Sequence, residues 1–197
     1  GFVAQVSGGK RYRLGLDFFV LAARAGQADG LRDLARPVLL RLSATLTDTI
    51  FLLVRDRYDV VCLDRIEGPF PIRSFTGDIG GKIPLGIGQG SLAILAHLPE
   101  TEAEEVIRFN MPRLLDRGFL DEAGLRLELA KARAQGWVSL NTGLIPGMAG
   151  LAVPVFDADR KAVAALSIGT LAERLSPERL PNVVRILQTE AATLGAG

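Results

Sequence analysis

A glycine-studded segment that runs directly into an apolar helix constrains this chain more than any other feature. The segment Gly80–Gly90 is followed by the apolar run Ser91–Ala96. Glycines leave backbone N–H groups uncovered, and uncovered N–H groups at a helix start favour an anion such as a carboxylate. No acid, base or activated nucleophile accompanies them. The segment therefore predicts a place that holds a small anionic molecule without transforming it.

Two interpretations of this segment stay open: a ligand cradle, or a tight turn and helix cap with close packing. It is neither a Walker A phosphate loop nor a GxGxxG fingerprint, because Lys82 does not occupy the phosphate-lysine position. The segment also follows no strand–helix–strand pattern. We therefore expect neither nucleotide binding nor a cofactor.

Composition narrows the class of protein. The 197 residues carry 23 basic and 22 acidic side chains, a formal charge of +1, which gives no electrostatic case for nucleic-acid binding by this piece alone. The single cysteine, Cys62, excludes an intrachain disulfide and favours a reducing, cytoplasmic setting. The single histidine, His97, excludes His-rich metal sites and Ser-His catalysis. We expect no membrane span and no signal peptide.

Hydrophobic periodicity and turn residues predict strands, then helices, then strands and a last helix. A β-hairpin is expected over residues 1–15. Helices are expected over 16–27, 31–46 (bent or restarted at Pro37), 87–97, 102–110, 121–135 and 177–194. Strands are expected over 49–54, 58–66, 70–75, 137–140, 151–156 and 162–168. Tight turns between consecutive strands indicate an α+β fold, an antiparallel sheet with helices packed on it.

Two further positions could contact a ligand. The loop 141–150 is too apolar for a free connector, so it either packs on the core or lines a pocket lid, and both remain open. Ser167 lies in an apolar strand and needs a hydrogen-bond partner if buried. That partner is either a backbone carbonyl or a ligand carboxylate. Ser91, near a helix start, is expected to be a cap.

Charged residues give no sign of catalysis. Asp64, Arg65 and Glu67 stand near a strand end and are expected to be solvated or interfacial. No pair of carboxylates in an apolar setting indicates acid–base chemistry.

The order of these motifs resembles that of the IclR family of bacterial transcriptional regulators. The motifs that carry the resemblance are residues 9–15 (the end of a DNA-binding wing), 35–39, 58–68 (ending in a sequence similar to D-R-V-E-G), 84–96, 151–157 and 164–168. The resemblance implies a GAF-like effector-binding domain over residues 16–197, with a small-molecule pocket on one face of the sheet. Residues 1–15 would be a remnant of a winged helix-turn-helix DNA-binding domain.

The resemblance also implies a set of ligand-binding residues and no catalytic or metal-binding ones. The set is Ile72, Gly86, Gly88, Gln89, Gly90, Leu140, Met148, Gly150, Ser167 and Gly169. Gly150 and Gly169 stand where the family often has a cysteine and a second serine, and Leu140 where it often has an acidic residue. These departures indicate a roomier, less polar pocket, suited to an aromatic or long aliphatic carboxylate.

The function implied is that of a ligand sensor. A small organic acid would alter DNA binding through an N-terminal domain, in a homodimer or homotetramer. Two alternatives stay open: a small enzyme on the same fold that uses Ser91 or Ser167, and a structural oligomerisation domain with a vestigial pocket. Sensing requires that the amides around Gln89 and the hydroxyl of Ser167 face one shared hollow on the same side of the sheet.

Overall fold

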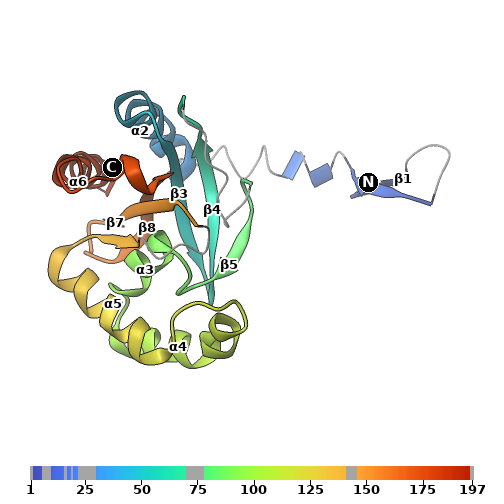
Figure 1. Ribbon diagram of the computed structural model, residues 1–197. Helices are drawn as coiled ribbons and strands as arrows, with labels where there is room; N and C mark the ends of the chain where they lie inside the picture. Colours follow the sequence, from blue (N-terminus) through green and yellow to red (C-terminus); the bar gives the residue numbers. More distant parts are fainter. Residues whose placement is uncertain are drawn as a thin grey trace. The chain divides into compact units, whose positions relative to one another are not determined.

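The computed structural model describes residues 2–5, 10–15, 17–18, 20–21, 30–69, 78–140 and 146–195, in two compact units, Gly1–Leu34 and Ala35–Gly197. In the first unit, β1 (Val3–Gln5) and β2 (Tyr12–Leu14) pair antiparallel, which confirms the predicted hairpin (Figure 1). Most of the helix predicted over 16–27 and the whole strand predicted over 70–75 lie outside the described residues.

The second unit is built on a six-stranded antiparallel sheet, in the order β5-β4-β3-β8-β7-β6. Its strands are β3 (Thr49–Asp56), β4 (Asp59–Ile66), β5 (Lys82–Pro84), β6 (Val138–Leu140), β7 (Met148–Phe156) and β8 (Ala162–Leu171). The predicted α+β class is confirmed. Strand β8 lies at the centre, between β3 and β7, so its residues are positioned by both neighbours.

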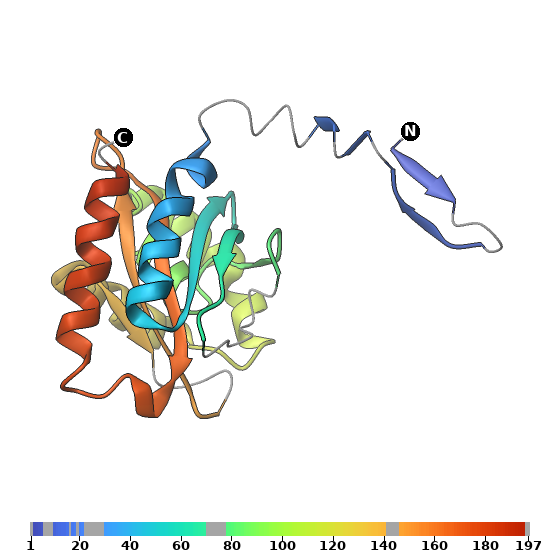
Figure 2. The ribbon, with the colours of Figure 1, turned by 90° about the horizontal axis from the view of Figure 1, so that it is seen from above.

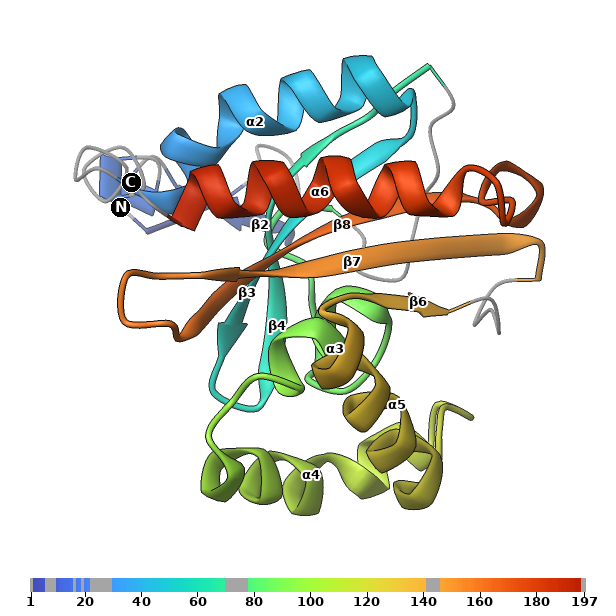
Figure 3. The same ribbon diagram turned by 90° about the vertical axis from the view of Figure 1, so that its left-hand side faces the viewer.

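Helices cover both faces of this sheet (Figure 3). On one face lie α2 (Leu31–Leu46) and α6 (Leu180–Gly195), side by side in Figure 2 and joined by the Arg41–Glu190 ion pair. On the other, α3 (Gln89–Leu95) rests on the sheet, with α4 (Glu100–Leu115) and α5 (Glu122–Gln135) beyond it. A short 3₁₀ helix, η1 (Ala172–Arg174), follows β8.

Burial on two faces explains the continuous apolar runs of the central strands. Side chains alternate along a strand, so Phe51 and Leu53 of β3 join Leu92 of α3 in one core cluster. Ile50 and Leu52 are equally buried on the opposite face, beneath α2 and α6. The sheet is thus the middle layer of three, and a side chain's position in the strand determines the layer it contacts.

Several elements differ from their predicted bounds. Helix α3 begins only at Gln89, because Gly88 has φ 78 and is not helical. Helix α4 continues through Pro112 to Leu115, and α2 likewise continues through Pro37. Strand β7 starts at Met148, where a loop was predicted. Helix α6 starts at Leu180, after a turn in which the Ser176 carbonyl accepts from the Leu180 N–H.

The ends of α5 match the prediction residue by residue. The Asp121 carboxylate accepts from the backbone N–H of Gly124 at 2.8 Å, and Gly136 adopts the left-handed conformation, φ 75, that ends the helix. Both are local signals, so sequence alone suffices to find them.

The cap gives a first prediction. Asp121→Ala leaves a first-turn N–H without its acceptor and should lower the free energy of unfolding by about 1 kcal/mol. Urea denaturation measures it, with Asp159→Ala in an exposed turn as the control. Equal effects of the two substitutions would show that the cap adds nothing to stability.

Candidate functional site

Strand register brings five of the predicted site residues onto one face of the sheet. Leu140 of β6 lies opposite Gly150 of β7, which lies opposite Gly169 of β8. Directly opposed residues point to the same face, as do residues two apart in one strand. Met148 and Ser167 therefore share the face of Gly150 and Gly169. No local signal fixes this register; it follows from pairing across the sheet.

Helix α3 lies on that same face and brings Gln89 and Gly90 to it. The side-chain nitrogen Nε2 of Gln89 lies 3.4 Å from Ser167 Oγ and 3.3 Å from the carbonyl oxygen of Ile168. A Cβ at Gly90 would lie 3.4 Å from the Cβ of Ser167 and only 2.3 Å from Cδ1 of Leu53. Gly90 is therefore required for the close approach of α3 to the sheet. Gln89 and Ser167 thus meet on one side of the sheet.

The start of α3 lacks a side-chain cap. Gly88 is the N-cap, with φ 78, and no side chain accepts from the first-turn N–H groups. With seven residues, α3 has only a short row of aligned peptide dipoles. The donors at this helix start are therefore individual N–H groups rather than a strong macrodipole. A Cβ at Gly88 would meet nothing within 4 Å, so this turn borders open space.

One of the predicted residues, Gly86, is turned away from this place. Gly86 faces α4, since a Cβ there would lie 3.0 Å from Cδ2 of Leu114. Its N–H donates to the hydroxyl of Ser91, which is buried and does not cap α3, so the predicted cap is wrong. Ile72 lies outside the described residues, as do residues 141–145 of the loop predicted over 141–150.

The room expected at Gly150 is occupied. A Cβ at this position would lie 1.9 Å from Nε2 of Gln89 and 2.4 Å from its Cδ. The glycine makes space that the Gln89 carboxamide fills. Considering position 150 alone cannot reveal that its space is filled, because the side chain that fills it belongs to another element, helix α3.

An open cavity of about 520 Å³ lies elsewhere, at the turn between β3 and β4. It is lined by Asp56, Arg57, Tyr58, Asp59, Lys82, Phe109 and Arg113. Lys82 pairs with Asp56, and Arg113 Nη2 donates to Asp59 at 2.7 Å, so both of its carboxylates are already paired. The cavity lies at the Asp56 end of β3. Gly169 pairs with Thr49, at the other end of this strand. The cavity is therefore separate from the face that carries Ser167.

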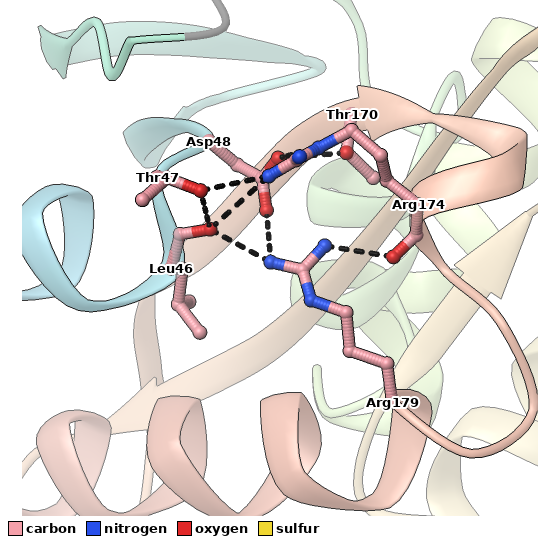
Figure 4. Close-up of polar contacts among 6 residues, drawn as sticks. All are labelled: Leu46, Thr47, Asp48, Thr170, Arg174 and Arg179. Atoms are coloured by element: carbon pink, nitrogen blue, oxygen red, sulfur yellow. Dashed lines mark hydrogen bonds and ion pairs between the residues drawn. The ribbon is translucent and has the colours of Figure 1, made fainter.

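A buried charged cluster, missed by the sequence reasoning, lies on the α2 side of the sheet (Figure 4). Asp48 is fully buried, and its Oδ1 accepts from the Thr170 hydroxyl at 2.7 Å and from Arg174 Nε at 3.0 Å. Its Oδ2 accepts from Arg179 Nη2 at 2.6 Å. Arg179 Nη2 also donates to the carbonyl of Leu46, at the end of α2. We call Asp48, Thr170, Arg174 and Arg179 the Asp48 cluster.

Asp64 is a second buried carboxylate. The expectation that it is solvated or interfacial is wrong, because it is fully buried and accepts from Nη1 of Arg36 at 2.8 and 3.0 Å. The guanidinium of Arg36, on α2, thus compensates this buried charge.

Neither a metal site nor a membrane helix is found in the described part of the chain. No group of three or more His, Cys, Asp or Glu there could hold a metal ion. Among the same residues, every helix is too short or too polar to cross a bilayer.

Comparison with known proteins shows a family match over most of the chain. Residues 24–196 match the family model "Bacterial transcriptional regulator IclR C-terminal". The regulator KdgR of Escherichia coli is 30% identical over 197 residues, which cover 100% of this chain and 74% of KdgR. The regulator KipR of Bacillus subtilis is 28% identical over 182 residues, 92% of this chain and 72% of KipR. Both are named as HTH-type transcriptional regulators.

Solved structures show the same fold. An IclR transcriptional regulator from Alicyclobacillus acidocaldarius superposes with a TM-score of 0.84 at 25% identity, covering 98% of this chain and 78% of that one. The IclR of Thermotoga maritima superposes with a TM-score of 0.80 at 24% identity, covering 99% and 78%.

Proposed function

This chain belongs to the IclR family of bacterial transcriptional regulators, and on that premise we propose that residues 16–197 sense a small organic acid. Members of this family bind DNA and small-molecule effectors. The effector proposed here is a carboxylate, aromatic or long aliphatic, that alters DNA binding by an N-terminal domain. Because the family consists of regulators, the interpretation as a small enzyme using Ser91 or Ser167 is set aside.

The observation that supports this proposal best is the convergence of Gln89, Gly90 and Ser167 on one face of the sheet. Ser167 is 2% exposed, and its hydroxyl accepts from Gln89. A hydroxyl can accept and donate at once. Its proton can therefore be donated to a carboxylate placed between Ser167 and the uncapped N–H groups of α3.

We further propose that the β1–β2 hairpin is the remnant of a DNA-binding wing, and that the regulator is a homodimer or homotetramer in the cytoplasm. The hairpin belongs to a separate compact unit, and the family match begins only at residue 24.

Calorimetry tests the site. Phenylpyruvate should bind the chain measurably, whereas glyoxylate should not. Ser167→Ala should weaken binding of phenylpyruvate about tenfold or more, because a hydrogen bond to a charged group contributes about 1.5–3 kcal/mol. The matched control is Ser139→Ala, because Ser139 neighbours Leu140 in β6 and points to the other face.

Two outcomes would contradict the proposal. If neither phenylpyruvate nor other aromatic and long aliphatic acids bind at millimolar concentration, the chain is not a sensor of such acids. If Ser139→Ala weakens binding as much as Ser167→Ala, the acid does not contact the face described here.

A further inference from the structure

The side chain of Gln89 lies in the space above Gly150 and in contact with Ser167. Its nitrogen is oriented toward the carbonyl oxygen of Ile168, which can only accept, so the amide hydrogens must face the sheet. Ser167 Oγ is the second acceptor of the same nitrogen. Gln89 therefore covers the hydroxyl that the proposed function assigns to the effector.

From this arrangement we propose that the Gln89 side chain is a removable plug. It fills the space above Gly150 when no acid is bound, and it swings aside to give Ser167 to the carboxylate and the vacated space to the acid's side chain. Gln89 thereby controls how readily an acid reaches Ser167. This inference rests on the proposed function and adds the residue that controls it.

The bonds that hold the plug are long. At 3.4 and 3.3 Å, both exceed the usual 2.7–3.2 Å of N–H···O bonds. Gln89 is only half-buried, and the adjacent Gly88 borders open space, so a released side chain has room and regains rotamer freedom. A carboxylate at Ser167 would instead form a charge-assisted bond, about twice as strong as a neutral one. The stronger bond therefore favours the acid over the plug at Ser167.

Gly150 has a complementary role. A Cβ at this position would overlap Nε2 of Gln89, so any larger residue would expel the plug. The two residues therefore depend on each other: the absence of a side chain at Gly150 leaves a space, and the Gln89 side chain fills it.

Thiol labelling tests the plug without any acid. In the Ser167→Cys variant, methyl methanethiosulfonate should react slowly, because Gln89 covers position 167. Adding Gln89→Ala should raise the rate about tenfold or more, since thiol reactivity follows exposure. Adding Gln135→Ala should not; Gln135 also donates to a backbone carbonyl, that of Trp137, but elsewhere. The natural Cys62 adds little background, because it is fully buried and burial raises the pKa of its thiol to about 11.

A second variant opens the cover while keeping Gln89; a Cβ at position 150 would also lie 2.9 Å from the Ile168 carbonyl oxygen, so its folding is checked by urea denaturation. Ser167→Cys with Gly150→Ala keeps Gln89 but forces it aside, so labelling should also accelerate. If position 167 reacts equally fast with and without Gln89, the plug is overturned, whatever the acids do.

Acid binding tests the plug in a second way. Because the plug must leave Ser167 before an acid can bind there, Gln89→Ala should tighten binding of phenylpyruvate about tenfold, since the open state no longer has to be selected. Weaker phenylpyruvate binding by Gln89→Ala would make Gln89 a ligand contact and overturn the plug. A third outcome is possible: labelling of the Ser167→Cys variant is faster without Gln89, but no variant binds an acid. That outcome would refute acid sensing while supporting the proposal that Gln89 covers position 167.

Discussion

Asp48→Asn should lower the free energy of unfolding by about 3 kcal/mol, because it removes one partner of a buried ion pair and leaves the others charged. The asparagine keeps the shape of the side chain, so no cavity forms. One of its two terminal atoms becomes a donor, however, and faces a donor of Arg174 or Arg179.

The size of this effect follows from burial. Asp48 is 0% exposed, which places it among the sites where losing a partner costs roughly 3–5 kcal/mol. The side chains of Arg174 and Arg179 are 24% and 27% exposed, so water relieves part of their unpaired charge. The lower end of the range is therefore expected.

Urea denaturation measures the change. Glu122→Gln provides the matched control, since Glu122 pairs with Arg126 at the surface and should contribute less than about 1 kcal/mol. A loss at position 48 no larger than that of the control would mean that the Asp48 cluster does not stabilise the fold.

Gly68→Ala should be nearly as destabilising, at about 3 kcal/mol, the upper end for an overpacked position. A Cβ there would lie 2.6 Å from the carbonyl carbon and oxygen of Thr47 and 2.7 Å from the carbonyl oxygen of Asp48. These are backbone atoms and cannot rotate away. Thr47 has φ 63, and its hydroxyl accepts from Arg174, which fixes this stretch further.

Gly124→Ala is the control for Gly68→Ala. Gly124 is helical, its nearest neighbours are side-chain atoms at 3.1 Å or more, and alanine is favoured over glycine in helices, so the change should stay within about 1 kcal/mol. If the two variants unfold at the same urea concentration, the backbone at residues 47–48 shifts to accommodate the new Cβ, and the prediction for Gly68→Ala is wrong.

Local chemistry explains what the sequence predicted well. Asp121 and Gly136 bound α5 through contacts within one turn, and the leucine spacing in 31–46 gave α2 its observed bounds. The same holds for the hairpin turns of β3–β4 and β7–β8. The bounds of α3 failed because two opposing local signals, apolar periodicity and the glycine at 88, compete there.

Pairing between distant segments explains what it could not predict. Strand β5 is three residues long and exists because Lys82–Pro84 pairs with Asp59–Val61. Asp48 and its partner Arg179 are 131 residues apart, so nothing near either residue indicates the other. For the candidate site, the family resemblance supplied Gln89, Gly150 and Ser167 as separate positions. Only the register of β7 and β8 under α3 shows that one of them fills the space of another.

The ion pairs of α2 have a mechanical consequence. The helix is fastened through Arg36 to β4, through Arg41 to α6, and through its last carbonyl, that of Leu46, to the Asp48 cluster. A helix held at one point can rotate about its own axis. Contacts to three different elements along its length restrict that rotation. Thr170 of that cluster directly follows Gly169 on β8, so a chain of hydrogen bonds connects this strand to the end of α2.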